Sequence, residues 1–106
     1  MRKSDLNEMF GGWFIGDFEP SLLKSKDFEV AIKNYKKGDY EESHHHKIST
    51  EYTVILNGYV KMNGIEHGTG SILTIHPMES TDFLALTDVT TVVVKTPSSK
   101  NDKYLD

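Results

Sequence analysis

The chain has 106 residues, which fits one domain, and 12 basic residues against 16 acidic ones give a net charge of −4. This balance lacks the basic footprint of a nucleic-acid or membrane binder, so we expect a small-molecule ligand, no nucleic acid and no membrane. The absence of cysteine excludes disulfides, thiolate catalysis and cysteine-based zinc sites. A polar start and the lack of a long apolar run predict a cytoplasmic protein.

The N-terminal segment predicts a short helical turn followed by a strand-forming region. Asp5 followed by Glu8 resembles a capping box, and Gly11-Gly12 would end a helix soon after it. From Trp13 onward, glycines, aromatic residues and β-branched residues favour strands over helices.

The first clear strand is expected over 28–35, where apolar residues alternate with charged or small ones, as is typical of a half-buried strand. A polar turn over 36–39 and a histidine-rich strand should follow it. The two faces of the first strand carry Phe28, Val30 and Ile32 against Glu29, Ala31 and Lys33.

The centre of the chain carries the strongest hairpin signal, Asn57-Gly58, because both central residues of a type I′ turn need positive φ. We therefore expect strands 51–56 and 59–62 to pair with each other. A second turn is expected around Asn63-Gly64. The remaining strands are expected over 71–75, before Pro77, and over 82–86 and 89–95.

Short strands at regular spacing, separated by turn signals and without a long helical period, predict an all-β sandwich or barrel. We expect a single domain over 1–106. It would consist of an N-terminal arm over 1–27, a barrel core over 28–95 and a loosely ordered tail over 96–106.

Three potential metal ligands lie between two turn glycines. Residues two apart on a strand share a face, so His44 and His46 should point together and His45 away from them. Glu51 lies an odd number of positions after His46, so a turn just before it must reset the alternation. The pattern is G-x5-H-x-H-x4-E-x6-G, formed by Gly38, His44, His46, Glu51 and Gly58.

This pattern resembles the first motif of the cupin superfamily and matches it at every defining position. The second cupin motif, roughly G-x5-P-x-G-x2-H-x3-N, is similar here at its first position, Gly70. The resemblance covers 28–95 and implies a double-stranded β-helix, or jelly-roll barrel, that is often dimeric. At the other positions of the second motif stand His76, Met78, Thr81 and Ala85.

For the site, the resemblance implies a divalent metal ion, iron, manganese, zinc or nickel, held by His44, His46 and Glu51 as a facial triad with open positions. Thr81 stands where a fourth ligand histidine is expected, and a neutral hydroxyl is a poor replacement for imidazole. The other candidates for a fourth contact are His67, His76 and Glu79.

Three functions stay open at this level. The first is a metal-dependent enzyme, an oxygenase or isomerase, acting on a small polar substrate. The second is a non-catalytic small-molecule-binding or sensor cupin. The third is a metal-independent sugar isomerase or epimerase, which would need a His or Tyr acid-base pair in the cavity. No catalytic residue is assigned.

The strand that contains Glu51 has an apolar outer face. Tyr52, Val54 and Leu56 point away from the face of Glu51. Such a stripe predicts cover by a second copy of the chain, hence a homodimer, or by the aromatic segment 13–18.

Overall fold

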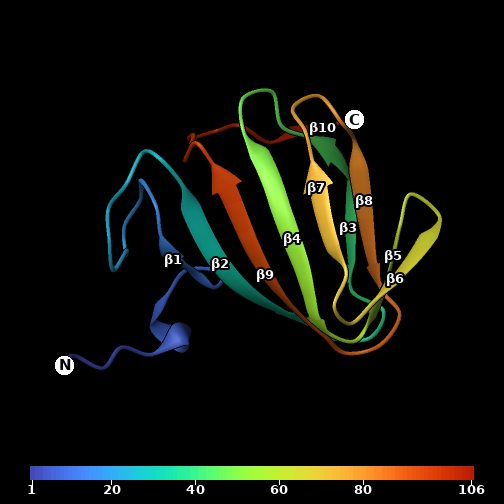
Figure 1. Cartoon of the computed structure of the whole chain (residues 1–106), viewed down its shortest axis with the longest axis horizontal. Helices are drawn as coiled ribbons and strands as arrows, with labels where there is room; N and C mark the ends of the chain where they lie inside the picture. Colours follow the sequence, from blue (N-terminus) through green and yellow to red (C-terminus); the bar gives the residue numbers. More distant parts are fainter.

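The structure is a computed structural model that describes residues 1–106. Its strands form two antiparallel five-stranded sheets, in the orders β1-β2-β9-β4-β7 and β10-β3-β8-β5-β6. Figure 1 shows the first sheet running from β1 across to β7. The predicted all-β class is confirmed. The strands are β1 Trp13–Ile15, β2 Glu29–Tyr35, β3 Tyr40–His45, β4 Thr50–Asn57, β5 Tyr59–Met62, β6 Ile65–Gly68, β7 Ile72–Ile75, β8 Thr81–Ala85, β9 Val89–Thr96 and β10 Tyr104–Leu105.

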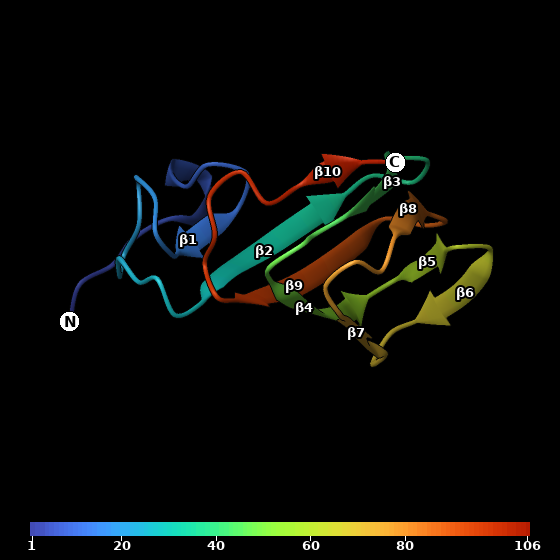
Figure 2. The same cartoon turned by 90° about the horizontal axis from the view of Figure 1, so that it is seen from above.

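The N-terminal arm begins with a single 3-10 turn, η1 (Leu6–Glu8), where the Asp5 carboxylate accepts a hydrogen bond from a backbone N–H at 2.9 Å. After it, β1 pairs with β2 at the edge of the first sheet. Phe14 and Leu22 lie beside Ile32 on the outer face of β2. Both views place the N-terminus at the end of the molecule farthest from β5 and β6 (Figures 1 and 2). The chain contains no helix with the length and apolarity needed to span a membrane.

The predicted hairpin at Asn57-Gly58 is wrong, because the two flanking strands belong to different sheets. Strand β4 pairs with β7 and β9, whereas β5 pairs with β6 and β8. Of the two turn residues only Gly58 has a positive φ, 104°. A Cβ there would lie 2.4 Å from the carbonyl oxygen of Asp88, so the crossing between sheets requires glycine.

The hairpin with positive φ at both central residues occurs at the next turn. Asn63 and Gly64 have φ values of 50° and 80°, and they join β5 to β6 with Met62 opposite Ile65. This is the backbone pattern of a type I′ turn.

The C-terminal segment is ordered, contrary to the expectation of a loose tail. The side chain of Asp102 accepts hydrogen bonds from the backbone N–H groups of residues 47 to 49, at distances from 2.9 to 3.2 Å. Strand β10 pairs with the free edge of β3, and Asp106 lies 2.7 Å from the ring of His45. The segment therefore holds the loop between β3 and β4 in place.

The space between the sheets has an apolar end and a polar end. Along β4 the inward residues change from Ile55 to Thr53 and Glu51, and along β9 they change from Val89 to Lys95. A cluster of buried apolar side chains fills the first end. The apolar cluster consists of Ile55, Val60, Met62, Ile75, Phe83, Ala85 and Val89.

The outer face of β4 is apolar, as predicted from alternation. Tyr52 and Leu56 are 41% and 54% exposed, and Ile72 on the neighbouring β7 is 65% exposed. Of the aromatic segment 13–18, Phe14 reaches the outer face only near Ile32. The face around β4 therefore stays open to solvent in the single chain.

Candidate functional site

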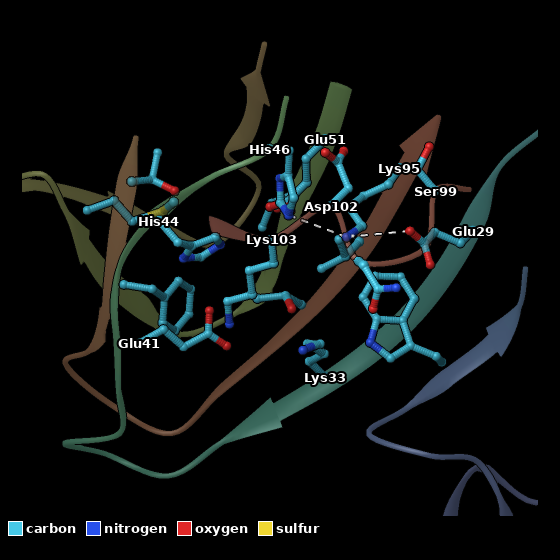
Figure 3. Close-up of a pocket in the computed structure, with 18 of the residues that line it drawn as sticks. Glu29, Lys33, Glu41, His44, His46, Glu51, Lys95, Ser99, Asp102 and Lys103 are labelled. Atoms are coloured by element: carbon cyan, nitrogen blue, oxygen red, sulfur yellow. Dashed lines mark hydrogen bonds and ion pairs between the residues drawn. The ribbon is translucent and has the colours of Figure 1, made fainter. Parts of the chain in front are cut away.

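A cavity of about 390 Å³ lies between the sheets at the polar end. Strands β2, β9 and β4 form one wall, β3 and β8 form the opposite wall, and residues 99–103 close it from the C-terminal side. Figure 3 shows charged side chains that line this cavity. The lining residues that carry charge or an imidazole ring are Glu29, Lys33, Glu41, His44, His46, Glu51, Lys95, Lys100, Asp102 and Lys103.

The structure brings His44, His46 and Glu51 to this one cavity. The two imidazole rings lie 5.4 Å apart between centroids and almost perpendicular, at 80°. The loop over 46–49 resets the alternation, so that Glu51 at the start of β4 also faces inward. His45 points away, as predicted, and stacks on Tyr104.

Each of these three side chains already has a neighbour. The Nδ1 atom of His44 lies 3.0 Å from the carbonyl oxygen two residues earlier. The Nε2 atom of His46 lies 3.4 Å from the Lys95 ammonium nitrogen, and Glu51 accepts a 2.7 Å hydrogen bond from Thr53. As they lie, no three His, Asp or Glu side chains form a group placed to hold a metal ion.

Lys95 is the central charge of the cavity. In the register of the first sheet it lies between Glu29 on β2 and Glu51 on β4. Its ammonium forms a 3.4 Å ion pair with Glu29, and the two side chains are only 14% and 10% exposed. The dashed lines of Figure 3 join Lys95 to Glu29 and to His46. The Trp13 ring adds a cation-π contact, with its centroid 5.3 Å from the ammonium.

Burial and the charge of Lys95 shift the pKa values of His46 and Glu29. Burial, followed by the positive charge of Lys95, lowers the pKa of His46 to about 4. At neutral pH the ring of His46 is therefore uncharged and accepts from the ammonium. Burial also raises the pKa of Glu29, although Lys95 opposes this rise.

The floor of the cavity contains a fixed polar pair. The hydroxyl of Tyr35 on β2 donates a 2.9 Å hydrogen bond to Glu41 on β3. Burial, followed by the negative charge of Glu41, raises the pKa of Tyr35. The phenol therefore stays protonated at neutral pH, and its ring packs on Phe83 with 4.5 Å between centroids.

Comparison of the sequence with protein families and with curated proteins finds no match. The structure, however, resembles solved structures over most of its length. A Klebsiella pneumoniae protein with a double-stranded β-helix domain aligns with 98% of this chain and 90% of its own, at a TM-score of 0.72 and 18% identity. An RmlC-like cupin from Shewanella frigidimarina aligns with 73% of this chain and 71% of its own, at a TM-score of 0.65 and 15% identity. The chain has the cupin fold.

The predicted double-stranded β-helix is thus confirmed. Oxalate decarboxylase from Bacillus subtilis, a protein with Mn(II) centres, also shares this fold, with a TM-score of 0.68 and 18% identity. That alignment covers 76% of this chain but only 24% of the decarboxylase. Cupins with different chemistry share the architecture, so these similarities establish the fold and the site must indicate the function.

The structure also locates the residues at the positions of the second cupin motif, which this chain matches only in part. Thr81 on β8 lies opposite His44 in the strand register and lines the cavity. A hydroxyl therefore stands on the cavity wall where the motif has an imidazole. The other three candidates for a fourth contact lie outside this cavity: His67, His76 and Glu79.

Sequence reasoning missed the charged residues of β2 and β9. The buried face of β2 is that of Glu29, which is 7% exposed, and Ala31, whereas Val30 and Ile32 face outward. Alternation places Glu29 and Lys33 on one face of the strand, but only the order of the sheet shows that this face is the buried one. The burial of Asp102 could not be predicted, since nothing in a polar tail distinguishes an acidic residue that will be buried.

Proposed function

We propose that this cupin binds a small polar molecule in the cavity at the polar end of the barrel. The observation that carries the proposal is the cavity of about 390 Å³, which is lined by charged and hydroxyl side chains. Burying such groups destabilises a fold unless they are paired. A concave site with convergent polar groups is the usual form of a ligand pocket.

We propose further that the ligand binds without a metal ion, because Lys95 already places a cation at His46. The ammonium contacts the ring nitrogen of His46 and the carboxylate of Glu29 at the same time. A divalent ion on that nitrogen would have to displace the ammonium, since two cations so close together repel each other. The side chains of His44, His46 and Glu51, as they are arranged, therefore do not fit a bound metal ion.

A second candidate function is the metal centre implied by the first cupin motif, in which His44, His46 and Glu51 bind divalent iron, manganese, zinc or nickel. It is supported by the convergence of these three side chains on one cavity and by the Mn(II) centres of oxalate decarboxylase, which shares the fold. Such an ion would supply Lewis-acid or redox chemistry for an enzyme acting on a small polar substrate. This candidate requires Lys95 to leave His46.

Metal content separates the two candidates. Untagged protein purified without chelator should contain far less than one equivalent of metal after incubation with each of the four ions. The double variant Glu29→Gln/Lys95→Met removes the ammonium without leaving a buried charge unpaired, and it should take up more metal than the wild type. One equivalent of metal in the wild type, lost in His46→Ala, would establish the metal centre and contradict binding without metal.

Ligand binding itself is testable by equilibrium dialysis of the protein against a mixture of cell metabolites, with mass spectrometry of the retained compounds. The wild type should retain at least one small polar compound. Lys61→Gln, an exposed change on β5 outside the cavity, should retain it equally, whereas the double variant Glu29→Gln/Lys95→Met should not. Retention of nothing by the wild type would contradict the proposed function.

We also propose that a second copy of the chain covers the apolar face of β4. All 106 residues have a place in the structure, so no further segment within them remains to cover Tyr52, Leu56 and Ile72. An uncharged apolar face is self-complementary, as a two-fold interface must be. Light scattering should give the mass of a dimer, and Leu56→Glu should give that of a monomer. A monomeric wild type would contradict this assembly.

A further inference from the structure

The charges of the cavity narrow the chemical class of the ligand. We infer that the ligand is a small hydroxylated anion, whose carboxylate or phosphate group binds near Lys33, Lys95 and Lys103. The inference rests on the proposed function, since it concerns the same cavity. It depends on three independent features: the pairing of the cavity carboxylates, the unpaired lysines, and one buried hydroxyl without a partner.

Every carboxylate of the cavity already has a partner. Glu29 is paired with a lysine, and Glu41 accepts a hydrogen bond from a tyrosine. Glu51 accepts one from a threonine, and Asp102 accepts from three backbone N–H groups. The acidic groups are thus engaged within the protein, so a cationic ligand would have to compete with these contacts.

Of the four lysines that line the cavity, Lys95 and Lys100 form ion pairs, and the other two are in the opposite situation. Lys33 and Lys103 line the cavity but take part in no ion pair. The ammonium groups of Lys33 and Lys95 lie 5.4 and 5.3 Å from the centroid of the same Trp13 ring. Trp13 therefore contacts both ammonium groups, and an anion bound in the cavity would balance their positive charge. Lys103 enters the same cavity from the C-terminal segment (Figure 3).

One buried hydroxyl points to the position of the anion. Thr91 is 1% exposed, and its Oγ1 atom has no hydrogen-bond partner. Thr91 lines the cavity and lies directly opposite Lys33 in the pairing of β9 with β2. Buried hydroxyl groups without a partner are rare because they destabilise the fold. A ligand oxygen beside Lys33 would accept from this hydroxyl and complete its hydrogen bonding.

The rest of the wall suits hydroxyl groups on the ligand. Thr53, Thr81, Ser99 and Asn101 add side chains that both donate and accept hydrogen bonds. A volume of about 390 Å³ is near the lower limit for ligand pockets. This combination of size and polarity fits a sugar acid or a sugar phosphate better than a larger or apolar anion.

The test uses three matched sugars: D-glucose, D-glucuronate and D-glucose 6-phosphate. Each is titrated into the 106-residue protein while backbone amide NMR signals are followed, and acetate and inorganic phosphate are titrated as minimal probes of the anion site. The variants are Lys33→Gln and Thr91→Val, with Lys61→Gln as the control outside the cavity. Thermal unfolding of each variant shows whether a loss of binding reflects a loss of fold.

We expect at least one of the charged sugars to shift the amides of Lys33, Thr91 and Lys95 and to bind about tenfold or more tightly than glucose. Whether glucuronate or glucose 6-phosphate binds more tightly distinguishes carboxylate from phosphate. Lys33→Gln and Thr91→Val should each weaken that binding by about tenfold, and Lys61→Gln should leave it unchanged.

Two results would overturn the inference. If glucose binds as tightly as both charged sugars, the cavity binds small polar molecules, as proposed, but does not select anions. If neither the charged sugars nor the two minimal anions shift the cavity amides, the anion site does not exist. The dialysis experiment then decides separately whether the cavity binds another kind of ligand.

Discussion

The two ends of the barrel interior are built by the same strands but have opposite chemistry. At one end Ile55 and Val89 are almost fully buried among apolar neighbours. At the other end the same strands, β4 and β9, place Glu51 and Lys95 on a cavity wall. The apolar end gains stability from burial, whereas the polar end keeps charged groups inside through specific pairing. Stability and ligand binding should therefore respond separately to substitutions at the two ends.

The largest expected effect is a loss of stability at the apolar end. Ile55 is fully buried, so Ile55→Ala should lower the free energy of unfolding by about 4 kcal/mol through lost transfer energy and a residual cavity. Ligand affinity of the folded fraction should stay the same. Denaturant unfolding measures the first quantity and dialysis the second. Ile65→Ala, on β6 and 62% exposed, is the control and should change stability by about 0.5 kcal/mol or less.

At the polar end, Asp102→Ala should affect stability and binding together. The substitution leaves three backbone N–H groups in the loop over 47–49 without their acceptor. We expect a loss of about 3 kcal/mol and weaker ligand binding, because this loop joins His46 to Glu51. Asp102→Asn keeps one acceptor and should lose less. Unchanged affinity in a folded Asp102→Ala variant would show that the C-terminal segment serves stability alone.

Predictability from sequence also differed between the two ends. Alternation and turn glycines located most strands, and the spacing of His44, His46 and Glu51 placed them on one cavity. The error at Asn57-Gly58 arose because local turn chemistry cannot distinguish a hairpin from a crossing between sheets. Distant atoms, including the carbonyl oxygen of Asp88, decide that turn.

The charged pairs of the polar end were beyond the reach of local reasoning. Glu29 and Lys95 meet only because β2 pairs with β9, a contact between distant parts of the chain. Without that pairing, charged residues on an alternating strand are expected to face water. The polar interior became recognisable only once the strand order was known.

The pH dependence of stability should report on His46 in the metal-free protein. Its pKa is about 4 in the folded chain, below the ordinary value of 6.5. Between these values the unfolded chain binds a proton that the folded chain does not, so stability should fall as pH drops through this window. The loss should reach about 3 kcal/mol near pH 4.

His46→Gln is the matched variant for this measurement, because its amide oxygen can still accept from Lys95. It should show a smaller fall in stability between pH 6.5 and 4 than the wild type. The lowered pKa of Asp102, by contrast, makes stability fall only at more acid pH, below its ordinary value of 3.8. Equal pH slopes for the wild type and His46→Gln would contradict a buried neutral imidazole.

The smallest expected effect is a gain in stability, opposite in sign to the others, and it comes from replacing the Thr91 hydroxyl. At this position stability and ligand binding should change in opposite directions. Thr91→Val replaces the unpartnered Oγ1 with a methyl group of similar shape, so the unfolding free energy should rise by about 1 kcal/mol. The same substitution should weaken binding of the charged sugar. Val93→Thr places a hydroxyl two residues along the same inner face of β9, where Val93 is 6% exposed, and should lower stability. A Thr91→Val variant that is less stable than the wild type would mean that the hydroxyl already has a partner, such as a bound water molecule, in the free protein.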